Sequence, residues 1–265
     1  MALPLEGKNI LVTRPTAQAA DLAQAISSAG GQPIWLPLIR IAPPNDKHAL
    51  NEVVERLDDF SIVIFISANA VQQGAPSLIT AHGRWPSHVL AAGIGPGTAR
   101  SLSSLGVNDC LTPPIKAGRF DSEALLALPE FAAGAVNGKK IAIMRGEGGR
   151  ELLSDSLRRR GANVVDAPCY QRIPRHAGWQ PLYEAWDNKQ LDAITISSSE
   201  ALRHFVDSLP EKRYLQLKST PIFAPHLRII DTARKLGLSL LVKTAPLDTG
   251  IVTSLCAYNW PSAER

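Results

Sequence analysis

The stretch KIAIMRGEGGRELLSDSLRRRGANVVDAP, residues 140–168, has the pattern of a strand, a helix and a second strand. Its apolar runs at 140–144 and 163–168 are short and typical of buried strands. The leucines between them lie on one face of a helix expected over 149–160, which the arginine run at 158–160 is expected to end. Because helices that alternate with strands favour parallel pairing, this stretch predicts an α/β fold.

The chain repeats this pattern. An offset of 131 residues carries Arg14 in NILVTRP onto Arg145 in KIAIMRG without a gap. The same offset carries Ser67 in VIFISANAV onto Ser198 in ITISSSEAL. Only the turns GIGPGTAR and FAPHLRIIDTAR need an added shift of three residues. We interpret the chain as a duplicated supersecondary unit; the alternative is chance similarity between two α/β segments.

The remaining apolar runs extend the alternation. Each leads into a helical pattern, and together they predict strands at 61–67, 88–94, 192–197 and 221–225. We therefore expect two doubly wound parallel-sheet domains. The segments 37–43 and 168–174 are equivalent under the repeat, and their bracketing prolines favour extended backbone, so we interpret them as crossovers. The sequence leaves open whether the repeats fold as consecutive domains or exchange their halves through these crossovers.

The composition is that of a soluble globular protein, with 45% hydrophobic and 20% charged residues among 265. Its net charge of +4 favours a small anionic partner over nucleic acid. Cys110, Cys169 and Cys256 form no CxxC pair, which argues against a disulfide framework and a thiolate metal site. The start MALPLEGKNI lacks a signal-peptide pattern, and no apolar run approaches the roughly 18 residues of a membrane span. We expect a cytoplasmic protein with reduced thiols and no membrane partner.

Small polar residues and arginines follow several of the predicted strands or open the helices after them. In open parallel sheets, ligands bind beyond the carboxyl ends of the strands, where loops lead into helices. The residues at these places are Thr13, Arg14, Ser67, Thr98, Arg145, Ser198 and Thr232. Because most of them recur in both repeats, we expect two similar walls to face one ligand. For Ser67 and Ser198, a helix N-cap is the alternative role.

The glycine-rich turn at 145–150 is typical of an anion site. Its glycines allow backbone amides to approach a ligand closely, and the helix that follows presents unpaired N–H groups. The candidate ligand-binding residues of this turn are Arg145, Gly146, Gly148, Gly149 and Arg150. A tight connection that binds nothing accounts for such a turn equally well.

The sequence has no pattern for a nucleotide, a metal or a catalytic nucleophile. It contains no GxxxxGK[ST], HExxH or GxSxG motif, and neither glycine-rich turn supplies a full dinucleotide fingerprint. We therefore expect no cofactor, and an enzyme of this sequence needs a substrate that does much of the reacting itself. Tyr170 is the exception, since its place in a crossover allows the phenol to point into a cleft between domains. Packing within a sheet is the alternative for this tyrosine.

The motifs in their order resemble those of a known family. LVTRP, IFISANAV, GIGPGTA, MRGEGGRELLSDSLRRRGANVVDAPCYQR and ITISSSEAL are similar to uroporphyrinogen-III synthase, most closely its proteobacterial members, over residues 8–255. The most specific piece is 141–172. The resemblance implies two flavodoxin- or Rossmann-like α/β domains joined by a two-stranded β-ladder. One domain is then 1–37 with 173–265, and the other is 40–169.

The resemblance also implies an activity. Such lyases convert the linear tetrapyrrole hydroxymethylbilane into uroporphyrinogen III, inverting the terminal pyrrole ring and releasing water without metal or cofactor, in porphyrin and heme biosynthesis. Tyr170 matches the family's tyrosine in the second crossover, which implies a proton donor to the leaving hydroxyl. Ser67, Thr98 and Ser198 match cleft positions, and Arg14 and residues 145–150 match anion-lining loops.

One turn departs from the family. The segment APHLRIIDTA stands where many relatives have a second GPTTA-like turn, so the match of Thr232 rests on the three-residue shift. His226 and Arg228 are alternative anion contacts there.

Two other functions stay open. A non-catalytic two-domain protein that binds a tetrapyrrole or another polyanion uses the same turns, and shows affinity without turnover. A nucleotide-dependent transferase is disfavoured by the missing fingerprints. The resemblance implies a monomer.

Overall fold

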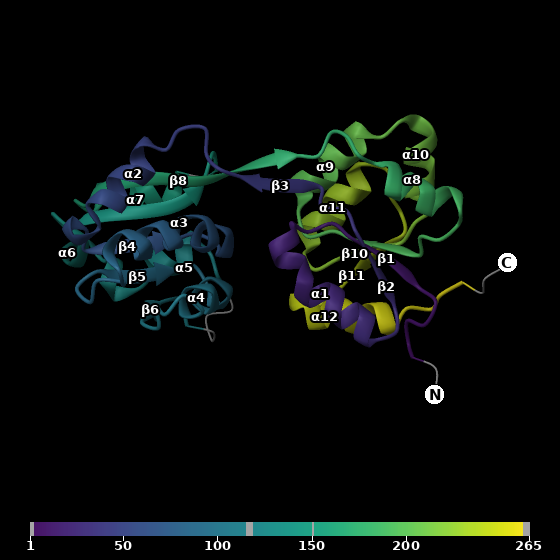
Figure 1. Cartoon of the computed structure of the whole chain (residues 1–265), viewed down its shortest axis with the longest axis horizontal. Coiled ribbons are helices and arrows are strands. Elements are labelled where there is room, and N and C mark those ends of the chain that lie inside the picture. The colour runs from purple at the N-terminus through teal and green to yellow at the C-terminus, as the bar shows by residue number, and fades with distance from the viewer. Residues whose placement is uncertain (1–2, 115–118, 150, 262–265) are drawn as a thin grey trace. The chain divides into compact units, whose positions relative to one another are not determined.

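The computed structural model describes residues 3–114, 119–149 and 151–261 and divides into two units. Unit 1 comprises Met1–Arg40 with Ile173–Arg265, and unit 2 comprises Ile41–Arg172. The chain passes into unit 2 within strand β3 (Ile39–Ala42) and returns within strand β8 (Asn163–Pro174). These two strands are hydrogen-bonded neighbours (Figure 1). Unit 1 is therefore discontinuous in sequence.

The described part of unit 1 contains a parallel sheet in the order β11-β10-β9-β1-β2. Its strands are β1 (Asn9–Val12), β2 (Gln32–Trp35), β9 (Ala193–Thr195), β10 (Ile222–Ala224) and β11 (Leu241–Lys243). Its helices are α1 (Thr16–Ser28), α8 (Gln180–Asp187), α9 (Ser199–Ser208), α10 (Glu211–Lys218), α11 (Leu227–Lys235) and α12 (Leu247–Cys256). Ile10 and Val12 of β1 pack in one cluster with α1 and α12, while α9 and α11 contact each other.

The described part of unit 2 contains a sheet in the order β3-β8-β7-β4-β5-β6. Its other strands are β4 (Ile62–Phe65), β5 (Leu90–Gly93), β6 (Cys110–Leu111) and β7 (Lys140–Gly146), and the pairs from β8 to β6 are parallel. Its helices are α2 (His48–Glu55), α3 (Ala68–His82), α4 (Pro96–Ser103), α5 (Ser122–Leu126), α6 (Ala133–Val136) and α7 (Leu152–Arg159).

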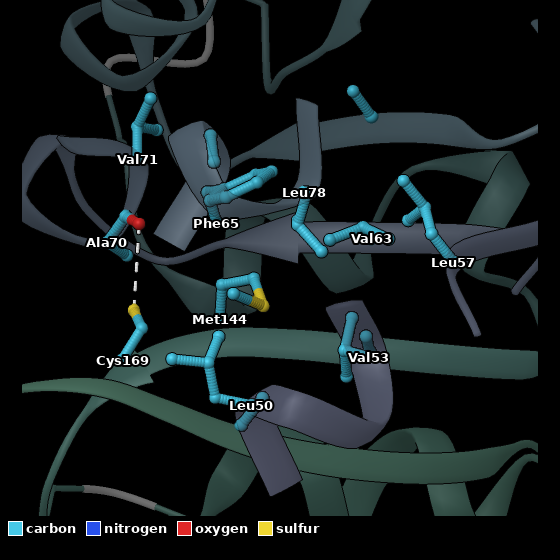
Figure 2. Packing of buried hydrophobic residues seen from close by; sticks show 14 of the residues in the cluster. Leu50, Val53, Leu57, Val63, Phe65, Ala70, Val71, Leu78, Met144 and Cys169 are labelled. Atoms are coloured by element: carbon cyan, nitrogen blue, oxygen red, sulfur yellow. Dashed lines mark hydrogen bonds between the residues drawn. The ribbon is translucent and has the colours of Figure 1, made fainter. Parts of the chain in front are cut away.

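Alternate residues of the strands in unit 2 fill two separate cores. Val63 and Phe65 of β4 pack with α2 and α3, as Figure 2 shows. Ile62 and Ile64 of the same strand pack on the opposite face with α5 and α7. Both faces of the sheet are therefore buried, which confirms the predicted doubly wound α/β class and explains why the strands appear as continuous apolar runs.

The repeat is visible in the strand registers. The β1–β2 pairing begins at Asn9 and the β7–β8 pairing begins at Lys140, which are related by the offset of 131. The N-caps of α4 and α11, Gly95 and His226, are related by the same offset. The added three-residue shift is therefore wrong. The shift aligned the sequence TAR, which both segments contain, although TAR lies three residues later in α11 than in α4.

Helix α7 differs from the prediction at its start and agrees with it at its end. It begins at Leu152 rather than at 149, because Gly148 and Gly149 have φ of 71° and 99°, which a right-handed helix does not allow. Just after its last turn, Arg160 donates hydrogen bonds to two main-chain carbonyls, at 2.8 and 2.6 Å. Arg160 therefore has a structural role, but its side chain bonds the Leu126 and Phe131 carbonyls and not the last carbonyls of α7. In the described ranges, no helix is long and apolar enough to cross a membrane.

Candidate active site

A buried tyrosine occupies the carboxyl edge of the sheet in unit 2. Tyr170 of β8 is 0% exposed. Its hydroxyl lies 3.2 Å from Oγ of Ser67, which directly precedes α3, and it accepts a hydrogen bond of 2.9 Å from the guanidinium of Arg172. The guanidinium carbon of Arg172 also lies 5.4 Å from the centre of the phenol ring. Three side chains of one unit therefore meet at one phenol oxygen.

Gly146 allows the Tyr170 hydroxyl to reach Ser67 across strand β7. The sheet order β8-β7-β4 places β7 between the tyrosine and the strand that leads to Ser67. A Cβ atom on Gly146, at the end of β7, would lie 2.7 Å from Cζ of Tyr170 and 2.8 Å from its Cε2. The β7–β8 register shifts at this glycine, which pairs with Tyr170. The ring thus lies over the end of β7 because residue 146 has no side chain.

Gly146→Ala is expected to destabilise unit 2 by about 1–3 kcal/mol, because the ring of Tyr170 has to move to admit the methyl group. The control is Gly134→Ala in α6, where a Cβ meets no atom within 4 Å. Urea unfolding of both variants measures the difference. Equal midpoints for the two variants would show that the ring yields without cost.

The start of α3 is tied to β8 beside this tyrosine. The thiol of Cys169 lies 3.6 Å from the carbonyl oxygen of Ala70 in the first turn of α3 (Figure 2). The same thiol lies 3.3 Å from the carbonyl oxygen of Arg145. Burial raises the pKa of Cys169 to about 12, so this thiol is a hydrogen-bonding group and not a nucleophile at neutral pH.

Arg145 in the glycine-rich turn pairs with carboxylates of the protein itself. The guanidinium of Arg145, 6% exposed, donates to Oδ1 of Asp166 at 3.2 Å and to the Gly148 carbonyl at 2.9 Å, and lies 3.5 Å from the Glu151 carboxylate. Gly148 and Gly149 are exposed. An anion that reaches this turn therefore meets exposed main chain, while the arginine expected to line the site is already paired. Arg150 lies outside the described residues.

The serines expected at the two helix starts are confirmed as N-caps. Oγ of Ser67 accepts a hydrogen bond of 3.1 Å from the Ala70 amide, and Oγ of Ser198 accepts one of 3.3 Å from the Ala201 amide. Only Ser67 also contacts a phenol among the described contacts. Under the offset of 131, Ile39 stands at the place of Tyr170. The two repeats have therefore diverged at the candidate site.

Thr98 and Thr232 do not occupy equivalent positions in their helices. Thr98 is the third residue of α4, is 5% exposed, and packs against Gly93. Thr232 is the sixth residue of α11, and its hydroxyl donates to the Arg228 carbonyl at 2.8 Å. Ile229 is the residue of α11 that corresponds to Thr98. The predicted match of Thr232 to Thr98 is therefore wrong, because it rested on the three-residue shift.

Thr13 and Arg14 follow β1 in unit 1. The hydroxyl of Thr13 donates to the Thr195 carbonyl at 2.6 Å and is buried. The guanidinium of Arg14 forms an ion pair with Asp248 in the first turn of α12. As in unit 2, the expected anion-lining arginine has a carboxylate partner within its own unit.

Arg172 is the residue of this site that sequence reasoning missed. It follows Tyr170 by two positions on the same strand, and such residues share a face of a sheet. That spacing was the available signal. Within the described ranges, no group of three His, Cys, Asp or Glu side chains is arranged to hold a metal ion.

The fold and the site define a class: α/β proteins of two parallel-sheet units with a phenol at the carboxyl edge of one sheet. A family model described as uroporphyrinogen-III synthase HemD matches residues 20–251. The uroporphyrinogen-III synthase of Escherichia coli K12 is 30% identical over 230 residues, covering 86% of this chain and 92% of the relative. That of Synechococcus elongatus is 33% identical over 205 residues, covering 76% and 75%. This chain belongs to the uroporphyrinogen-III synthase family, and it is accordingly an enzyme of the lyase class.

Solved structures agree on the fold. A mutant uroporphyrinogen III synthase from Thermus thermophilus aligns with a TM-score of 0.57 at 13% identity, covering 93% of this chain and 96% of that one. The synthetase from Helicobacter pylori 26695 aligns with a TM-score of 0.55 at 13% identity, covering 95% and 100%. At these identities the likeness establishes the fold alone.

Proposed function

We propose that this protein converts hydroxymethylbilane into uroporphyrinogen III, with inversion of the terminal pyrrole ring and loss of water. The observation that carries the proposal is the Tyr170 phenol, held by Ser67 and Arg172 at the carboxyl edge of a parallel sheet. Membership of the synthase family supplies the substrate and the reaction.

The reaction requires the protein to supply one proton and to hold the substrate in the correct orientation. The hydroxyl of the substrate leaves as water once it is protonated, and the pyrrole nitrogen stabilises the cation that remains. The substituted carbon of the terminal ring attacks this cation, and the resulting spiro intermediate fragments and recloses with the ring inverted. Tyr170 supplies the proton, and binding in one conformation supplies the selectivity.

The binding residues are proposed at the carboxyl edges of the two sheets. They are Thr13, Arg14, Ser67, Thr98, Arg145, Gly146, Gly148, Gly149 and Ser198, with Arg150 added from the sequence alone. Hydroxyl and amide donors hold the acetate and propionate groups of the substrate without opposing the cation that forms on it. The pairing of Arg14 with Asp248 and of Arg145 with Asp166 supports this, since each carboxylate offsets one positive charge.

The decisive assay supplies freshly made hydroxymethylbilane, oxidises the products and separates the porphyrin isomers by chromatography. We expect isomer III to form faster than isomer I forms spontaneously in a control without protein. Isomer I alone, at the control rate, would contradict the synthase function and favour a polyanion-binding protein. A monomeric state and a cytoplasmic location stay predictions.

A further inference from the structure

Tyr170 is buried too deeply to reach a substrate directly. Its side chain is 0% exposed, while Ser67 is partly exposed and Arg172 is exposed. The ring is covered on one side by the backbone of Gly146, whose absent Cβ would lie 3.0 Å from the phenol oxygen. A proton that leaves Tyr170 therefore needs a neighbour that accepts it and passes it on.

The hydrogen bonds around the phenol define a direction. A guanidinium has donors only, so Arg172 donates to the phenol oxygen. Because the phenol is fully buried and needs an acceptor for its own hydrogen, we assign Ser67 Oγ, 3.2 Å away, as the acceptor of the phenol O–H. Ser67 Oγ also accepts from the Ala70 amide at 3.1 Å. With both of its lone pairs used, Ser67 directs its own O–H away from these two partners. The chain of donors thus runs from Arg172 through Tyr170 to Ser67.

We propose that Ser67 relays the proton of Tyr170 to the leaving hydroxyl of the substrate, and that Arg172 is the positioning residue of the phenol. The proposal rests on the synthase function given above. In the first step the Ser67 O–H protonates the substrate hydroxyl as its C–O bond breaks and water leaves. In the same step the Tyr170 O–H moves to Ser67 Oγ. The substrate then carries a positive charge and Tyr170 a negative one.

Arg172 has two effects on this step. Its N–H bond to the phenol oxygen turns the phenol hydrogen toward Ser67, and its charge stabilises the phenolate that forms. At the end of the reaction, the carbon that closes the last ring bond loses a proton to restore its pyrrole. That proton returns through Ser67 to Tyr170, so the enzyme ends in its starting state.

The second repeat argues that the phenol contact is not a by-product of helix capping. Ser198 caps α9 in the way that Ser67 caps α3. The described hydrogen bond of Ser198 Oγ is the one from the Ala201 amide, and under the offset of 131 the sequence has Ile39 and Ile41 where unit 2 has Tyr170 and Arg172. A serine cap in this fold therefore needs neither a phenol nor a guanidinium, and unit 2 has both in addition to the cap.

The test removes the hydroxyl and keeps the cap. Ser67→Gly is expected to lower kcat roughly fivefold or more, and by a larger factor than KM rises, because glycine caps a helix almost as well as serine but has no proton to pass. Ser67→Thr, which keeps both the cap and the hydroxyl, is expected to have nearly the wild-type kcat. Ser198→Gly serves as the comparison for the loss of the cap alone, and Ser67→Gly should lower the unfolding midpoint further, because it also leaves the buried phenol O–H without its acceptor.

Ser67→Gly and Arg172→Gln, each of which should lower kcat when made alone, separate a relay from a binding role when they are repeated in a Tyr170→Phe background. With no phenol proton to pass, Ser67→Gly and Arg172→Gln are each expected to have almost no further effect on kcat. Equal losses in both backgrounds would show that Ser67 binds the substrate independently and would overturn the relay. Full kcat in Ser67→Gly would also overturn it. Isomer III as the product of every active variant keeps the synthase function itself separate from these outcomes.

Discussion

Tyr170→Phe is expected to lower the turnover number roughly tenfold or more, because it removes the proton donor and leaves the ring in place. The phenylalanine ring fills the same space over Gly146. The lost hydroxyl contacts only partly exposed Ser67 and exposed Arg172 in the described structure, and water satisfies both. The free energy of unfolding should therefore fall by no more than about 1 kcal/mol.

The measurement is the rate of isomer III formation from hydroxymethylbilane, together with a urea unfolding curve. Tyr214→Phe in α10 is the matched control, since that variant also loses a phenol hydrogen bond, the one of 2.6 Å to the Leu236 carbonyl. It should retain the wild-type rate. A wild-type rate in Tyr170→Phe would remove the tyrosine from the mechanism, together with the relay that depends on it.

The fold could be predicted from the sequence because both faces of each sheet are buried. Alternate residues such as Ile62 and Val63 enter different cores, so the strand is a continuous apolar run whichever face is considered. Helix starts were harder to predict. The start of α7 depends on the positive φ of Gly148 and Gly149, and a glycine permits that backbone without requiring it.

The site could be predicted only in part, because its contacts cross strands. Tyr170 and Arg172 share a face through their spacing on β8. Ser67 lies 103 residues away, and its contact with the phenol depends on the sheet order β8-β7-β4 and on the missing side chain of Gly146. The ion pair between Arg145 and Asp166 could not be predicted for the same reason, since Asp166 lies on the neighbouring strand.

Asp166→Ala is expected to cost about 2–4 kcal/mol of unfolding free energy, because it removes a carboxylate that pairs with the buried Arg145 guanidinium and also accepts from Ser154 and Arg158. Asp166 receives Arg145 and Ser154 on Oδ1, and Arg158 at 2.6 Å on Oδ2. The Glu151 carboxylate, 3.5 Å from Arg145, is 60% exposed and compensates only weakly. Urea unfolding measures the loss.

The control for this prediction is Asp155→Ala on α7. Asp155 is 54% exposed and lies 3.9 Å from the Arg158 guanidinium, so its loss should change the unfolding free energy by less than about 0.5 kcal/mol. A loss of the same size in both variants would mean that the Arg145–Asp166 pair adds nothing beyond a surface ion pair.

Asp166→Asn then distinguishes the two roles of Arg145. Asparagine keeps an oxygen acceptor for Arg145 and Ser154 but removes the charge that offsets the guanidinium. If Arg145 only braces the glycine-rich turn, KM for hydroxymethylbilane should stay at the wild-type value while the protein loses stability. If its guanidinium also attracts the substrate's carboxylates, the unbalanced positive charge should lower KM. The first result would assign anion binding at this turn to the exposed backbone of Gly148 and Gly149, and the second would assign it to Arg145.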